Sequence, residues 1–146
     1  LLLQKFPSNE FAATAKLTFL PSSAIVGERA GLLVMGMDYG LLSLEKTAEG
    51  FILSQNECLN AEKGSKETVN ESVKLEDAIL YLRVKVTPDA KCVFSYSTDG
   101  ANFSPLGKPF QAIEGKWIGA KVGFFCSRPV SNNDGGRVVL DSFTLE

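Results

Sequence analysis

Residues 11–20 read FAATAKLTFL, and this stretch indicates the fold class most clearly. Apolar side chains occupy every second position from Phe11 to Phe19, with small or polar residues between them. Successive side chains of a β-strand point to opposite faces, so a period of two is typical of a strand with one buried face. Pro21 follows directly and ends the strand.

The same period recurs along the rest of the chain, and no window holds an apolar stripe with the spacing of a helix. Turn-forming residues separate the apolar runs, and residues 60–66 are charged and small, which indicates a surface loop. Asp38 to Gly40 predicts the turn of a hairpin. About ten strands at this spacing favour an all-β fold, a two-sheet antiparallel β-sandwich. The further strands that we expect are 29–37, 41–45, 51–54, 81–86, 92–97, 121–126 and 137–145.

The composition fits one domain over residues 1–146, with 45% hydrophobic and 22% charged residues. Fifteen Lys and Arg against seventeen Asp and Glu give a net charge of −2, so the chain has no basic field for nucleic acid or anionic lipid. No apolar run reaches the ~18 residues that span a bilayer, and Leu1 to Leu3 lacks the flanks of a signal peptide. We therefore expect neither nucleic acid nor membrane as a partner.

Histidine is absent from the sequence. This excludes a Ser-His-Asp triad, a Cys-His pair and a histidine zinc site, and it leaves carboxylate, lysine or tyrosine chemistry. The turn-rich segment 131–136 holds Asp134, and Asp141 follows closely, so these two are candidate calcium ligands. Their spacing is not that of a calcium loop, and Asn, Asp and Gly are primarily turn formers. We expect no cofactor, with calcium as the alternative.

The chain has three widely spaced cysteines and no CxxC motif. Because the number is odd, at least one thiol is unpaired. Cys92 and Cys126 lie inside apolar runs, where a free cysteine usually behaves as a small hydrophobic residue. We expect both to be buried thiols rather than a disulfide.

The aromatic residues are candidates for sugar contact, because a sugar ring stacks its apolar face on an aromatic ring. Trp117 is the one tryptophan and has glycines two residues away on either side, which is typical of a loop or a strand entrance. The alternative is that Trp117 caps one end of the core. Tyr39, Tyr81 and Tyr96 could line a concave, sugar-facing sheet together with Arg83, although such residues are often amphipathic surface packing.

Several strings occur in an order that resembles the C-terminal β-sandwich of family-43 glycoside hydrolases, the β-xylosidases and α-L-arabinofuranosidases. The resemblance runs over nearly the whole chain and implies a concanavalin-like jelly roll. The strings that carry it are residues 28–32 (ERAGL), 37–39 (MDY), 94–100 (FSYSTDG), 117–126 (WIGAKVGFFC) and 139–143 (VLDSF).

In that family the sandwich follows a five-bladed β-propeller that holds the catalytic carboxylates, and nothing in this sequence corresponds to a propeller. The resemblance therefore implies a fragment of a longer multidomain enzyme that degrades hemicellulose. It implies an accessory domain, inert alone, whose partners are the propeller of the same polypeptide and an oligosaccharide from a plant polysaccharide. It also implies that Trp117 takes the place of an aromatic residue at the rim of the sugar pocket, and it favours a periplasmic or extracellular location.

Two other functions remain open from the sequence, an independent lectin-like carbohydrate-binding module and a structural sandwich without a ligand. An exposed apolar patch around Trp117 would favour an interdomain surface. A concave polar groove lined by Tyr81, Tyr96 and Arg83 would favour direct sugar binding.

Overall fold

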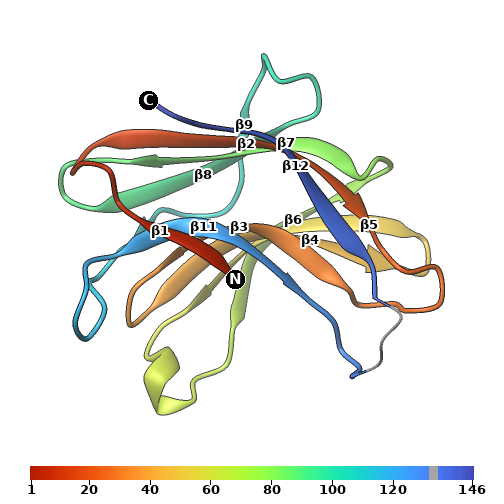
Figure 1. Ribbon diagram of the computed structural model, residues 1–146, viewed down its shortest axis with the longest axis horizontal. Helices are drawn as coiled ribbons and strands as arrows, with labels where there is room; N and C mark the ends of the chain where they lie inside the picture. The colour runs from red at the N-terminus through yellow and green to blue at the C-terminus, as the bar shows by residue number, and fades with distance from the viewer. Residues whose placement is uncertain (132–134) are drawn as a thin grey trace.

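Two antiparallel sheets lie face to face in a computed structural model that describes residues 1–131 and 135–146 (Figure 1). The described residues form twelve strands and one short 3-10 helix, η1 (Ala61–Lys63). The expected all-β, two-sheet sandwich is confirmed. Among the described residues no helix is long and apolar enough to cross a membrane.

Each sheet has one continuous order of neighbouring strands. The lower sheet of Figure 1 runs β1 (Leu2–Lys5), β11 (Lys121–Ser127), β3 (Arg29–Met35), β4 (Tyr39–Thr47), β5 (Gly50–Cys58) and β6 (Thr68–Leu75). The upper sheet runs β10 (Phe110–Gln111), β8 (Lys91–Ser97), β7 (Ile79–Val86), β2 (Phe11–Leu20) and β12 (Arg137–Leu145), with β9 (Ser104–Pro105) beside β8.

Residues 11–20, with their alternating apolar side chains, form β2, which lies between β7 and β12. Every second side chain from Phe11 to Phe19 is buried, and those between them are half-buried, as the period of two predicts. Both edges of this strand are paired, so its backbone groups are satisfied while its apolar face packs on the lower sheet. The β2 strand is therefore a central strand of the sandwich.

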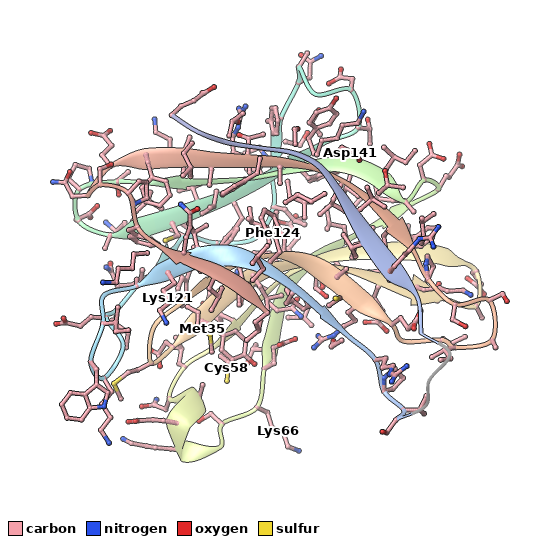
Figure 2. The ribbon with its side chains drawn as sticks, viewed as in Figure 1. Met35, Cys58, Lys66, Lys121, Phe124 and Asp141 are labelled. Atoms are coloured by element: carbon pink, nitrogen blue, oxygen red, sulfur yellow. The ribbon has the colours of Figure 1, made fainter. Side chains whose placement is uncertain are left out.

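The core fills the space between the two sheets, and it is built from the inward-facing side chains of both. Phe124 of β11 lies between the sheets (Figure 2), and its ring meets the edge of Phe143 of β12 at a centroid distance of 5.1 Å. Burying one such large apolar side chain stabilises a fold by roughly 1.5–3 kcal/mol. The largest apolar side chains that are completely buried are Leu17, Leu32, Leu42, Leu44, Leu53, Leu80, Leu82, Phe94 and Phe110.

The structure differs from the expected strands at polar segments. Strand β5 continues past residue 54 through a polar run to Cys58, and β6 carries exposed polar side chains at the edge of the lower sheet. Tyr39 already belongs to β4, so the tight turn before it lies at Gly36 to Asp38. Hydrophobic periodicity predicts such strands poorly because polar residues dominate them, although Val73 and Leu75 of β6 do pack against the core.

Candidate functional site

Trp117 stands at the tip of the loop 112–120, which joins β10 to β11. The amide of Gly115 donates a hydrogen bond to the carbonyl oxygen of Ile118 at 2.8 Å, so Lys116 and Trp117 form the tip. The Trp117 side chain is 88% exposed. It therefore does not cap the core, and that alternative is wrong.

The base of this loop is fixed to two neighbouring turns. The amide of Met37 donates to the carbonyl oxygen of Glu114 at 3.3 Å, which ties the loop to the turn between β3 and β4. The amide of Ala112 donates to the carbonyl oxygen of Ala90 at 2.9 Å, which ties it to the turn between β7 and β8. An exposed tryptophan is thus presented on an anchored loop.

A hollow of about 290 Å³ lies beside the indole of Trp117. Its apolar lining comes from Leu3, Met35, Trp117 and Ile118, which we call the Trp117 patch. Lys116 and Lys121 also line the hollow. This arrangement offers an aromatic anchor with a cationic rim, which suits contact with another surface.

The four other sugar-contact candidates do not share a face. Tyr81 and Arg83 point outward from the upper sheet, because they alternate with completely buried leucine and valine residues of β7. Tyr96 pairs with Leu82 and packs against the core, while Tyr39 lies on the lower sheet. The expectation of one concave groove lined by these residues is therefore wrong.

On the upper sheet, Arg83 and Tyr81 are engaged within the domain. The guanidinium carbon of Arg83 lies 3.6 Å from the ring centroid of Phe103, and its Nε donates to Thr14 Oγ1 at 2.8 Å. The Tyr81 ring lies so close to Gly100 that an added Cβ would be 2.7 Å away from it. These contacts fasten the segment 98–103, which rises above the upper sheet in Figure 1, onto the outer face.

On the lower sheet, Tyr39 belongs to a polar cluster around Glu67. The Glu67 carboxylate accepts hydrogen bonds from Arg29 Nη1 at 2.7 Å, from Asn56 Nδ2 at 2.7 Å and from the Tyr39 hydroxyl at 3.2 Å. Burial raises the pKa of Tyr39 well above its usual range, and the Glu67 charge adds to this effect. Burial also acts to raise the pKa of Glu67, but the hydrogen bonds from Asn56 and Arg29 outweigh it and hold that pKa below its usual value.

The Glu67 cluster fastens the segment 59–67 to the outer face of the lower sheet, below which η1 lies in Figure 1. Sequence reasoning missed this cluster, since Glu67 directly follows a stretch that we expected to be a surface loop. No local pattern marks it, because Arg29 and Glu67 are 38 positions apart.

The three thiols are free. Cys92 is buried as expected, and burial raises its pKa to about 12. Cys58 is also buried, and its Sγ lies 3.2 Å from the carbonyl oxygen of Ser65. Cys126 is exposed, which contradicts the expectation of a buried thiol. Cys126 lies near the end of β11, beyond the last residue that pairs with β1, and it lines two surface hollows, one shared with Arg137 and one with Val138 of β12.

Of the two calcium candidates, the structure describes only Asp141. Asp141 lies at a bulge of β12, and its Oδ2 accepts a hydrogen bond from Thr18 of β2 at 2.9 Å. Asp134 lies outside the described residues. In the part of the chain that the structure describes, no group of three or more Cys, Asp or Glu could hold a metal ion.

Comparison with known proteins identifies the family. The family model described as the β-xylosidase C-terminal concanavalin A-like domain matches residues 1–146. The chain therefore belongs to the β-xylosidase C-terminal concanavalin A-like domains, which are C-terminal domains of family-43 glycoside hydrolases. No curated protein matches the sequence.

Solved structures of family-43 enzymes share this fold. The protein BlXynB from Bacillus licheniformis is 20% identical with a TM-score of 0.76, and the comparison covers 98% of this chain and 28% of that one. The xylan β-1,4-xylosidase from Bacillus halodurans is 18% identical, with a TM-score of 0.79 and coverage of 99% and 29%. A bifunctional protein from Bacteroides eggerthii is 19% identical, with a TM-score of 0.80 and coverage of 99% and 18%. The chain thus spans less than a third of the length of these relatives.

Proposed function

We propose that this chain is the accessory C-terminal sandwich of a hemicellulose-degrading glycoside hydrolase. It packs on the catalytic propeller of the same polypeptide, and its Trp117 loop helps to shape the sugar pocket without being catalytic alone. The observation that carries this proposal is the 88% exposure of Trp117 on an anchored loop, at the start of residues 117–123, which resemble the family's pocket-rim segment.

The position of Trp117 supports an interdomain role on physical grounds. An exposed indole gains little from its own domain, whereas tryptophan buried at the centre of an interface is often an energetic hot spot. The anchors at Glu114 and Ala112 hold the loop before any partner binds, so less conformational entropy is lost on docking. The loop is therefore suited to reach another surface and to hold its tip there.

The names of the relatives support the proposed substrate class. One solved relative is named a xylan β-1,4-xylosidase, and another is described with endo-xylanase and exo-arabinofuranosidase activity. We propose that the longer enzyme acts on xylan-derived or arabinan-derived oligosaccharides. The aromatic face of Trp117 would contact the apolar face of a bound sugar or the propeller beside it.

Hydrolysis assays with nitrophenyl xyloside and nitrophenyl arabinofuranoside test the proposal. The chain 1–146 should give no turnover above a buffer blank, while the polypeptide that joins it to its propeller should hydrolyse at least one of the two substrates. Deleting the sandwich from that polypeptide should lower kcat/KM. Turnover by the chain alone that survives repurification and is abolished by mutating one of its own carboxylates would overturn the accessory role.

A further inference from the structure

Two lysines line the hollow beside Trp117, and a third lysine pairs with one of them in the lower sheet. Lys5 of β1 pairs directly with Lys121 of β11, so their side chains lie on the same face of the lower sheet. That face also carries Met35, which pairs with Lys121 on its other side, and Figure 2 shows Met35 and Lys121 below the lower sheet. Lys116 and Lys121 line the hollow beside the indole. Like charges placed directly opposite each other in a sheet destabilise it, so this pairing calls for a compensating interaction.

Within the described residues no carboxylate lies in ion-pair range of Lys5, Lys116 or Lys121. Among the described residues, four other cations do have carboxylate partners, Arg29, Lys74, Lys91 and Lys108, with Arg29 2.7 Å from Glu67 and Lys108 2.6 Å from Glu57, whereas Lys63, Lys66 and Lys85 also have none. Loop 112–120 contains a single acid, Glu114, so these lysines and Glu114 together carry a net charge of +2, whereas the chain carries −2. The positive charge is concentrated around the exposed tryptophan.

We propose that the Trp117 patch docks on an acidic protein surface, whose carboxylates face Lys5, Lys116 and Lys121 around an apolar socket for the indole. This inference rests on the proposed function, and it assigns the acidic surface to the catalytic propeller. A central aromatic anchor with a charged rim is the usual anatomy of a protein interface. Complementary charge on the rim speeds association and fixes the orientation of docking.

A protein surface fits these observations better than a lipid bilayer or an acidic polysaccharide. Trp117 and Ile118 protrude together, with exposures of 88% and 40%, which requires an apolar socket that a flexible anionic sugar chain does not offer. Three lysines on a domain of net charge −2 give weak attraction to an anionic bilayer. Binding to a bilayer or to an acidic polysaccharide instead would contradict the proposal.

Quenching of Trp117 fluorescence tests the local charge in this chain, because Trp117 is its one tryptophan. The ratio of iodide to caesium quenching should exceed that of free N-acetyltryptophanamide at equal ionic strength, and the triple change K5Q, K116Q and K121Q should lower that ratio. The matched control is Lys74→Gln together with Lys91→Gln, two exposed lysines outside the patch that pair with acids. A ratio no higher than that of free N-acetyltryptophanamide in the unchanged chain would overturn the inference.

Binding to the separately produced propeller tests the partner, with Trp117 emission as the signal. The triple change K5E, K116E and K121E should weaken binding roughly tenfold or more, and added salt should weaken binding of the unchanged chain. Lys63→Glu with Lys74→Glu is the control and should bind as the unchanged chain does. If neither salt nor the triple change alters the affinity, the propeller surface is not acidic. The proposed function would still hold, because the two domains bind.

Failure of the propeller to bind at all would overturn the proposed function and this inference with it. Vesicles with phosphatidylglycerol and an oligosaccharide with glucuronic acid side groups serve as competing probes. If either one shifts the Trp117 emission while the propeller does not, the partner is not an acidic protein surface.

Discussion

Gly36 lies so close to Ile113 that a Cβ atom added to the glycine would sit 1.8 Å from the Ile113 carbonyl oxygen. This contact lets the turn between β3 and β4 support the base of loop 112–120, where the Met37 amide bonds to Glu114. The backbone of the loop that carries Trp117 is thus placed by a residue that has no side chain.

We expect Gly36→Ala to push the loop away from its support. Overpacking of this kind usually costs about 1–3 kcal/mol, and urea unfolding should show a loss of that size. Amide hydrogen exchange of Met37 should also become faster, because its hydrogen bond to Glu114 breaks. Gly119→Ala in the same loop is the control, since a Cβ there meets nothing within 4 Å. Equal stability of the two variants would show that the contact with Gly36 does not hold the loop.

The Glu67 cluster predicts a pH-dependent contribution to stability. The pKa of Glu67 in the folded protein lies below its usual value of 4.5, so the folded state binds the proton less tightly than the unfolded chain does. This stabilisation is complete above the unfolded pKa and is lost as the pH falls through the folded pKa. Glu67→Gln should cost about 1–3 kcal/mol near neutral pH. At a pH below both pKa values, most of this difference from the unchanged chain should vanish.

Glu49→Gln is the control for that experiment. Glu49 lies 3.9 Å from Lys74, and both side chains are more than four-fifths exposed, at 87% and 84%. Exposed pairs of this kind contribute about 0–1 kcal/mol, so this variant should change little at any pH. If Glu67→Gln lowers the free energy of unfolding equally at neutral and acidic pH, the charge of Glu67 does not stabilise the fold.

The thiols should react in two classes. Cys126 is exposed, so a thiol reagent should label it quickly in the native chain, whereas Cys58 and Cys92 should react only when the chain unfolds. Burial keeps the pKa of Cys92 near 12, which leaves almost no thiolate at neutral pH. Cys126→Ser should abolish the fast phase. Fewer than three thiols after denaturation without reductant, or a single rate for all of them, would contradict the structure.

The sequence predicted the β-sandwich because the alternation of apolar and polar residues that marks a strand is a local pattern. Residues 11–20 and 81–86 predicted both strands and which of their side chains are buried. The same alternation places Tyr96 on the inner face of its strand, together with the buried Cys92 and Phe94, whereas Tyr81 faces outward. Applied strictly, it would have excluded Tyr96 from an outward groove.

Other features depend on contacts between distant parts of the chain. Whether Tyr39 lies on the same sheet as Tyr81 follows from the strand order, which periodicity does not give. The Glu67 cluster and the exposure of Cys126 likewise depend on long-range pairing and on where a neighbouring strand ends. Flanking glycines made Trp117 a candidate for a loop tip, because that pattern is local, but its exposure had to come from the structure.

Truncation of Trp117 should leave the stability of this domain unchanged. With 88% of its side chain exposed, Trp117→Ala should change the free energy of unfolding by less than about 0.5 kcal/mol. A tryptophan buried in the core would cost about 3–5 kcal/mol when truncated to alanine. Urea unfolding of the chain 1–146 measures this directly, and Val69→Ala, at a valine 57% exposed on the edge strand β6, is the control.

The kcat/KM of the polypeptide that joins this sandwich to its propeller, measured with and without Trp117→Ala, tests whether Trp117 acts on the sugar pocket. If Trp117 acts across the domain boundary, kcat/KM should fall by roughly thirtyfold, the effect of losing a hot spot of about 2 kcal/mol. Val69→Ala in the same polypeptide should leave kcat/KM unchanged. An unchanged kcat/KM in the Trp117→Ala enzyme, once folded protein is counted, would contradict the account.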